Sequence, residues 1–151
     1  MTATPVLSQE EQDAKRRLRM AWFGYIGMIF GNFMAILDIQ IVASSLREIQ
    51  AGLSASADEL TWVQTSYLIA EVIAIPLSGY LCRMMSTRVY FVGCAIGFTI
   101  ASLLCGLAWN IESMIFFRVL QGFLGGGMIP TTLGAIFLMF PPDKRQLPTV
   151  L

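Results

Sequence analysis

Four apolar stretches dominate the chain and are separated by short polar connections. They cover residues 21–46, 60–82, 89–109 and 113–140. Each reaches the length of about 20 residues that a helix needs to cross a hydrocarbon core about 30 Å thick. The pattern therefore predicts an all-α integral membrane protein with four transmembrane helices.

The flanking segments and the composition support the same class of protein. Residues 1–20 form a polar N-terminal tail, and residues 141–151 form a short end after the fourth stretch. Of all residues, 56% are hydrophobic and only 13% are charged, with a mean hydropathy of +0.66, so the chain lacks the charged surface of a soluble domain. The first stretch exceeds the core of about 7–15 residues in a cleavable signal peptide, and we expect it to be retained as a span.

Basic side chains are unevenly distributed among the connections. Eight lie in the tail, the second connection and the last segment: Lys15, Arg16, Arg17, Arg19, Arg83, Arg88, Lys144 and Arg145. The first connection has one, Arg47, and the third has none. Since cytoplasmic loops of membrane proteins are enriched in lysine and arginine, we expect both ends in the cytoplasm. The same topology explains the basic run before the first span, so nucleic-acid binding has no support.

Residue types needed for metal or enzyme chemistry are scarce. The chain has no histidine, the commonest metal ligand among side chains. Its three cysteines, Cys82, Cys94 and Cys105, are interpreted as packing residues. No metal-ligand cluster, phosphate-binding loop or nucleophile–base pair can be assembled from the sequence, so we expect no cofactor and no enzymatic activity.

Three ionisable residues lie inside the apolar stretches: Asp38, Glu71 and Arg118. A charge there costs at least about 2.5–3.5 kcal/mol, and such residues usually line a polar path through the membrane, which favours transport. Asp38 and Arg118 lie about 10 Å and about 8 Å from the predicted outer ends of their helices. We therefore expect an ion pair between them. The alternative is a pair that only joins the first helix to the fourth.

Glu71 lies deeper, about ten residues from either end of its span, and has no obvious cationic partner. At helical spacing it shares one face with Gln64, Tyr67 and Ser78, and we expect this polar stripe to line water or substrate. Desolvation favours the neutral carboxyl, which suits a group that exchanges protons. The alternative is a permanently protonated glutamic acid that only hydrogen-bonds a neighbouring helix.

Glycines four residues apart occur in three of the apolar stretches. The pairs are Gly27 with Gly31, Gly93 with Gly97, and Gly122 with Gly126. Small residues at this spacing let membrane helices approach closely, so we expect a tight bundle. The run 125–127 with Pro130, and Pro76 in the second stretch, predict flexible points in these helices. Close packing alone is the other interpretation of the glycines.

Several short segments resemble motifs of one transporter family. Residues 117–126, FRVLQGFLGG, are similar to the fourth-helix arginine motif of the major facilitator superfamily, which has an R-x-x-Q-G core. Residues 37–42, LDIQIV, resemble the aspartate motif at the end of helix one in its fourteen-helix drug:proton antiporters. Further segments resemble the same subfamily, the membrane subunits of multidrug efflux systems: 62–67, 75–81, 128–130 and 140–142. The resemblance covers residues 24–145.

The resemblance implies antiport, in which proton entry drives the export of small amphipathic, often cationic drugs by alternating access of two six-helix halves. It implies that Asp38 is the proton-coupling acid, that Arg118 is its charge partner, and that Glu71 is a second protonation or cation-contact group. The residues expected to line the cavity are Gln64, Tyr67, Ser78 and Gln121. The implied location is the bacterial cytoplasmic (inner) membrane, and docking of a periplasmic adaptor is left open.

The connection between the second and third spans departs from the family pattern. The family reads G-x-L-a-D-r-x-G-r-r, whereas residues 79–88 read GYLCRMMSTR. Gly79, Arg83 and Arg88 are the expected inner-gate residues, but Arg83 replaces the acidic residue and Ser86 replaces the second glycine. The usual charge latch of the inner gate is therefore in question.

The sequence stops before the fifth helix of the family, so we expect the N-terminal part of a transporter, inactive on its own. Two alternatives remain open. One is a small four-span exporter that acts as a dimer with one essential glutamate; Glu71 and the length fit, although that glutamate lies in the first span. The other is a structural or regulatory membrane partner of full-length transporters.

Overall fold

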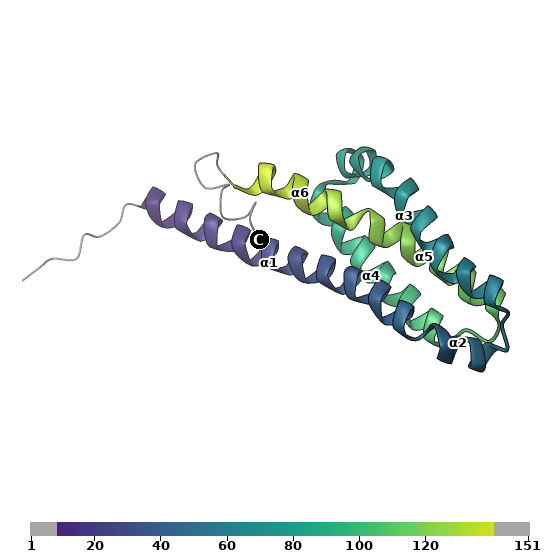
Figure 1. Ribbon diagram of the computed structural model, residues 1–151. Coiled ribbons are helices and arrows are strands. Elements are labelled where there is room, and N and C mark those ends of the chain that lie inside the picture. The colour runs from purple at the N-terminus through teal and green to yellow at the C-terminus, as the bar shows by residue number, and fades with distance from the viewer. Residues whose placement is uncertain (1–8, 141–151) are drawn as a thin grey trace, which may run out of the picture.

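The computed structural model describes residues 9–140 as a bundle of helices (Figure 1). The helices are α1 (Gln9–Ser44), α2 (Leu46–Leu53), α3 (Ala57–Met85), α4 (Thr87–Gly106), α5 (Ile111–Gly126) and α6 (Met128–Met139). With α5 and α6 taken together, four helices are long and apolar enough to cross a membrane. This confirms the expected all-α membrane fold. Residues 1–8 of the tail and the expected cytoplasmic end, 141–151, lie outside the described residues.

Helix bounds differ from the expected ranges mainly around the first span. α1 begins at Gln9 and so includes much of the tail, and the first connection contains the short helix α2. α3 begins in a capping box, in which the backbone N–H of Ser56 donates to the Glu59 carboxylate at 2.7 Å and the Ser56 hydroxyl oxygen accepts from the backbone N–H of Glu59. Asn110 and Ser113 form the same arrangement at the start of α5. Such caps satisfy N–H groups that a helix leaves unpaired.

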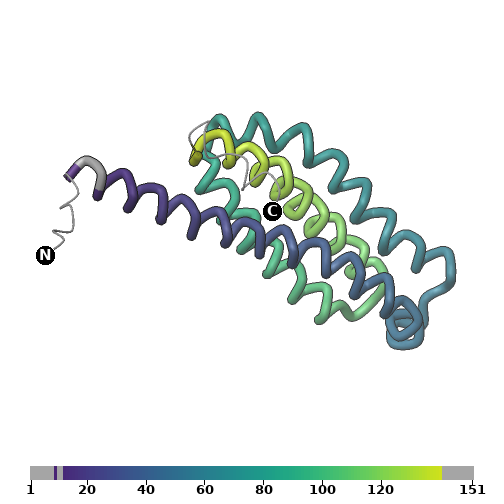
Figure 2. The backbone as a smooth tube through the Cα atoms, turned by 60° about the vertical axis from the view of Figure 1, so that its left-hand side comes forward, coloured from purple at the N-terminus to yellow at the C-terminus, as the bar shows by residue number. Residues whose placement is uncertain are grey.

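Helix α5 occupies the middle of the bundle, packed against α3 and α4, whereas α1 packs mainly against α6 (Figure 2). A Cβ atom at Gly122 would collide with the carbonyl oxygen of Tyr67, and one at Gly126 would lie 2.6 Å from the carbonyl oxygen of Glu71. The glycine pair of the fourth span therefore lets α3 and α5 touch through their backbones.

The other two glycine pairs are only half used. Gly31 and Gly97 each lie 2.9 Å, measured from an added Cβ, from a side chain of another helix. At Gly27 and Gly93 no atom of the part of the chain described here lies within 4 Å of that position. Within residues 9–140 both glycines lie on exposed helix faces, so their packing against a neighbouring helix stays a prediction.

The fourth span is divided at Gly127, between α5 and α6. Pro130 has no N–H to donate within the helix, and the Thr131 hydroxyl donates to the Gly127 carbonyl at 2.5 Å. The Tyr90 hydroxyl occupies the space that a side chain at position 127 would take. Pro76, by contrast, lies inside α3 without ending it. The interruption falls within the glycine run 125–127, where the sequence predicts a flexible point, and the flexibility itself stays a prediction.

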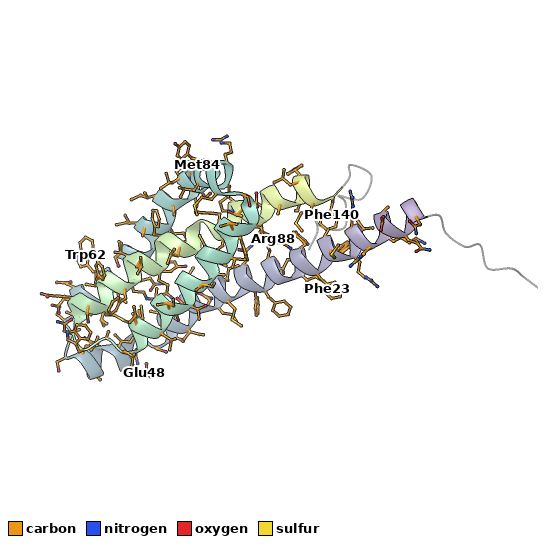
Figure 3. The ribbon with its side chains drawn as sticks, turned by 180° about the vertical axis from the view of Figure 1, so that it is seen from behind. Phe23, Glu48, Trp62, Met84, Arg88 and Phe140 are labelled. Atoms are coloured by element: carbon orange, nitrogen blue, oxygen red, sulfur yellow. The ribbon has the colours of Figure 1, made fainter. Side chains whose placement is uncertain are left out.

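The outer surface is apolar along the bundle (Figure 3). Large apolar side chains are exposed on every span, including Phe23, Val72, Leu103 and Phe137. Glu48 and Trp62 lie at one end of the bundle, and Met84 and Arg88 lie at the opposite end (Figure 3). An apolar surface with polar ends is what a multi-pass membrane protein presents to lipid.

Candidate functional site

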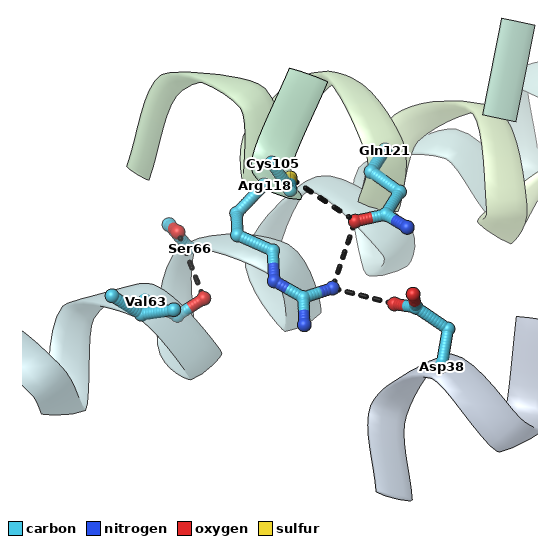
Figure 4. Close-up of polar contacts among 6 residues, drawn as sticks. All are labelled: Asp38, Val63, Ser66, Cys105, Arg118 and Gln121. Carbon is cyan, nitrogen blue, oxygen red and sulfur yellow. Dashed lines mark hydrogen bonds and ion pairs between the residues drawn. The ribbon is translucent and has the colours of Figure 1, made fainter. Parts of the chain in front are cut away.

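The structure brings Asp38 and Arg118 together near one end of the bundle. Arg118 Nη1 lies 2.6 Å from Asp38 Oδ2, which joins α5 to α1 (Figure 4). The Arg118 side chain is only 2% exposed and that of Asp38 is 17% exposed. Since a buried charge is tolerated only with a partner, each of these groups depends on the other.

Gln121 completes the polar contacts of Arg118 from one helical turn further along α5. Arg118 Nη1 donates to Gln121 Oε1 at 2.8 Å, and the Cys105 thiol donates to the same oxygen at 3.5 Å (Figure 4). Gln121 is fully buried. The spacing of three residues puts Arg118 and Gln121 on one helix face. Cys105, which sequence reasoning treated as a packing residue, connects α4 to this network.

Tyr67 lies under the guanidinium group. The guanidinium carbon of Arg118 lies 5.4 Å from the centroid of the Tyr67 ring, within the range of a cation–π contact. The ring is 2% exposed. Its backbone is held against α5 at Gly122, so the close approach of two helices also fixes the aromatic surface beside the charge.

Several buried polar atoms around the ion pair have no hydrogen-bond partner among residues 9–140. They are Arg118 Nε, Tyr67 Oη and Gln121 Nε2. A small cavity of about 10 Å³ lies beside the ion pair and is lined by Ile39, Val42, Gln64, Tyr67 and Arg118. Its volume suits about one water molecule. The site therefore combines a closed ion pair with unused hydrogen-bonding capacity.

Glu71 lies one helical turn beyond Tyr67 on α3 and is half-buried. Its Cγ is 3.0 Å from the Cβ position of Gly126, so the carboxyl stem rests on the glycine run of α5. No hydrogen bond or ion pair to the Glu71 carboxylate occurs within the described part of the chain. Tyr67 lies within electrostatic range of both Glu71 and Asp38.

Ser78 and the expected inner-gate residues lie away from this cluster. The buried Ser78 hydroxyl donates to the carbonyl of Ile75 at 2.6 Å, so its hydrogen atom is used within its own helix. Ser78, Gly79 and Arg83 line a groove of about 460 Å³ between α3 and α6. Arg88 lines a second, mostly apolar groove of about 500 Å³ between α1, α4 and α6. The expected polar stripe is therefore divided: Gln64 and Tyr67 line the cavity beside the ion pair, Glu71 lies further along α3 against Gly126, and Ser78 lines a separate groove.

Backbone geometry at Ser86 shows why the family pattern has glycine at this position. Ser86 lies between α3 and α4 with φ of 69° and ψ of 139°. This region is rarely adopted by residues with a Cβ atom and is favoured by glycine. The family pattern has glycine at this position, so the sharp connection is kept here with a residue that fits it less well.

Comparison with known proteins gives a consistent result. The family model of the Major Facilitator Superfamily matches residues 28–151. The chain is 65% identical over 133 residues to the colistin resistance protein EmrB of Acinetobacter baumannii, which covers 88% of this chain and 26% of that protein. It is 39% identical over 119 residues to the fatty acid resistance protein FarB of Neisseria gonorrhoeae, covering 79% of this chain and 24% of that protein. It is 35% identical over 126 residues to the multidrug export protein EmrB of Escherichia coli K12, covering 83% and 25% respectively.

The chain spans about a quarter of the length of these relatives. No solved structure matches it. The matches favour part of a transporter over a small exporter of another family.

Proposed function

The chain belongs to the major facilitator superfamily, and we propose that it forms the first four spans of a proton-coupled multidrug exporter. The observation that carries the proposal is the ion pair of Asp38 and Arg118, with 2.6 Å between its nearest atoms, inside helices that are apolar enough to cross a membrane. In this proposal, the ion pair acts as a switch that couples proton binding to transport. In this role, the pair is closed while Asp38 is charged and opens when Asp38 takes up a proton.

The energetics of the pair support a switch. At an effective dielectric constant of about 20, two charges 4 Å apart attract by about 4 kcal/mol before desolvation is counted. Protonation of Asp38 removes this attraction and leaves Arg118 buried without its counter-ion, which is strongly unfavourable. A single proton therefore changes the preferred contact of a helix-joining residue, as a mechanism of alternating access requires.

Glu71 is proposed as a second group that binds a proton or a cationic drug. Its carboxyl is half-buried and has no partner among residues 9–140. The charge of a Glu71 carboxylate is therefore not compensated by the described residues, and a positively charged ligand could pair with it. Gln64 and Tyr67, which line the small cavity beside the ion pair, and Gln121, which accepts a hydrogen bond from Arg118, are proposed to line the substrate path.

The proposed substrates are small amphipathic molecules, often cationic. Three relatives are named for resistance to colistin, resistance to fatty acids and multidrug export, and both named compound classes combine apolar and charged parts. Whether a periplasmic adaptor binds the exporter is left open. None of the described residues provides a surface that favours one.

The proposed location is the bacterial inner membrane, with the N-terminus in the cytoplasm. Basic residues near the start of α1, with Arg83 at the end of α3 and Arg88 at the start of α4, lie at one end of the bundle. The acidic residues Glu48, Asp58 and Glu59 lie at the other end. The basic end is proposed to face the cytoplasm, following the preference of lysine and arginine for that side. The ion pair then lies in the outer half of the membrane.

The test is Asp38→Asn in a complete exporter that carries these four spans. In proteoliposomes with an imposed pH gradient, we expect drug transport and drug-dependent proton release to be abolished, while the amount of inserted protein is unchanged. Asp58→Asn is the matched control, because it makes the same change at an exposed aspartate in the first turn of α3. Undiminished proton-driven transport by Asp38→Asn would remove Asp38 from the mechanism.

A further inference from the structure

We propose that Tyr67 is the positioning residue of this site: its aromatic ring holds the guanidinium of Arg118 against Asp38 and thereby sets the pH at which the pair opens. The inference rests on the proposed function. It assigns to the ring, and not to the hydroxyl group, a part in proton coupling.

Among residues 9–140, hydrogen bonds hold the guanidinium of Arg118 at one corner only. Both of its bonds, to Asp38 and to Gln121, come from Nη1. Nε is buried and has no partner among residues 9–140. With the side chain attached at Nε and hydrogen bonds at Nη1 alone, the plane of the guanidinium can still tilt, and a contact on its face limits this tilt. The Tyr67 ring, whose centroid is 5.4 Å from the guanidinium carbon, provides that contact.

Tyr67 is itself fixed on two sides. Its carbonyl oxygen lies against Gly122, and its hydroxyl oxygen is 3.0 Å from the Cβ position of Gly125. Around the ring, Ala35 and Phe98 complete a buried cluster. The hydroxyl group makes no hydrogen bond within the described range, so it contributes no bond to Arg118. The position of the ring is thus determined by packing, and its effect on Arg118 comes from the aromatic face.

The charged and titratable groups around the pair come from three helices. Asp38 faces the Arg118 guanidinium from α1, and Cys105 lies near the guanidinium on α4. Glu71 lies further along α3 near Tyr67. Of these groups, Asp38 is the one in salt-bridge contact with Arg118 in the part of the chain that the structure describes. Loss of the ring would let the guanidinium move away from Asp38. The Asp38 carboxylate would then lose part of the attraction to a counter-ion that favours its charged form.

The experiment measures the pH at which proton-driven drug transport is half-maximal, using the complete exporter in proteoliposomes. Tyr67→Leu is expected to move this midpoint upward by about one pH unit, a tenfold change in proton affinity. Tyr67→Phe keeps the ring and is expected to leave the midpoint unchanged. Phenylalanines with one, two and three ring fluorines at position 67 keep the shape but weaken the attraction for a cation, and are expected to raise the midpoint in steps.

The matched control is Tyr80→Leu, which makes the same change at an exposed tyrosine of α3 and is expected to leave the midpoint unchanged. A shift in Tyr67→Phe as large as in Tyr67→Leu, or no trend along the fluorinated series, would overturn the assignment to the ring. The fluorinated series decides the matter if Tyr67→Leu does not accumulate. Failure of the proposed function has a separate signature, since Asp38→Asn would then transport normally.

Discussion

Replacing Gly122 by alanine tests how closely α3 and α5 are packed. The new Cβ would collide with the carbonyl oxygen of Tyr67 and would lie 3.0 Å from the Tyr67 Cα. Both are backbone atoms, which cannot turn aside as a flexible side chain can. Because carbon atoms in contact prefer about 3.5–4.0 Å, the two helices would have to separate by about 0.5–1 Å.

The expected loss is about 1–3 kcal/mol of stability, the usual cost of overpacking. Gly93→Ala is the matched control, because no atom of the described residues lies within 4 Å of its Cβ position. There the new methyl group meets no obstacle, and alanine favours the helix over glycine by up to about 1 kcal/mol. The same substitution should therefore destabilise the protein at one position and leave it unchanged or stabilise it at the other.

Thermal unfolding of the detergent-solubilised protein, followed by tryptophan fluorescence, measures the difference. We expect Tm of Gly122→Ala to fall below that of the unmodified protein and Tm of Gly93→Ala to equal or exceed it. Equal Tm values for the two variants would refute the contact between the backbones of α3 and α5.

Two further predictions concern a connection and the ion pair. Ser86→Gly relieves a positive φ of 69° and should raise Tm, by relief of strain that costs of order 1–3 kcal/mol; an unchanged Tm would contradict strain at this position. Arg118→Ala leaves the carboxylate of Asp38 without its partner and should cost about 3–5 kcal/mol, whereas Asp38→Asn combined with Arg118→Gln should recover most of this loss. A double variant with a Tm as low as that of Arg118→Ala would show that the pair contributes no coupling energy.

The sequence was a good guide to the existence of helices and a poor one to which faces meet. Apolar runs of sufficient length identify spans because lipid requires them, and the four spans were found in this way. The pairs Gly93 with Gly97 and Gly122 with Gly126 have the same spacing, yet among the described residues only the second pair meets another helix at both positions. Spacing along one helix cannot tell which face a neighbouring helix covers.

For the candidate site, too, the sequence predicted which charged residues lie at the same depth, but not which other side chains contact them. The common depth of Asp38 and Arg118 followed from helix length and topology. Their pairing was expected because a charge inside an apolar run is costly unless it has a partner. The contact of Arg118 with the Tyr67 ring and the bond from Cys105 to Gln121 depend on the rotation of α3 and α4 about their axes. No residue pattern within either helix determines that rotation.

Helix α1 is fastened to its neighbours by two kinds of contact at different heights. Near its basic end, Tyr25 packs edge to face on Phe140 with 5.7 Å between ring centroids. This contact between two uncharged rings does not depend on pH. Further along, Asp38 makes an ionic contact that one proton removes. Acidification would therefore remove the contact of α1 at Asp38 and leave the contact at Tyr25 in place. α1 would then tilt about its aromatic contact. Spin labels on α1 and α5 beside the ion pair should move apart at low pH, whereas labels beside Tyr25 and Phe140 should keep their distance.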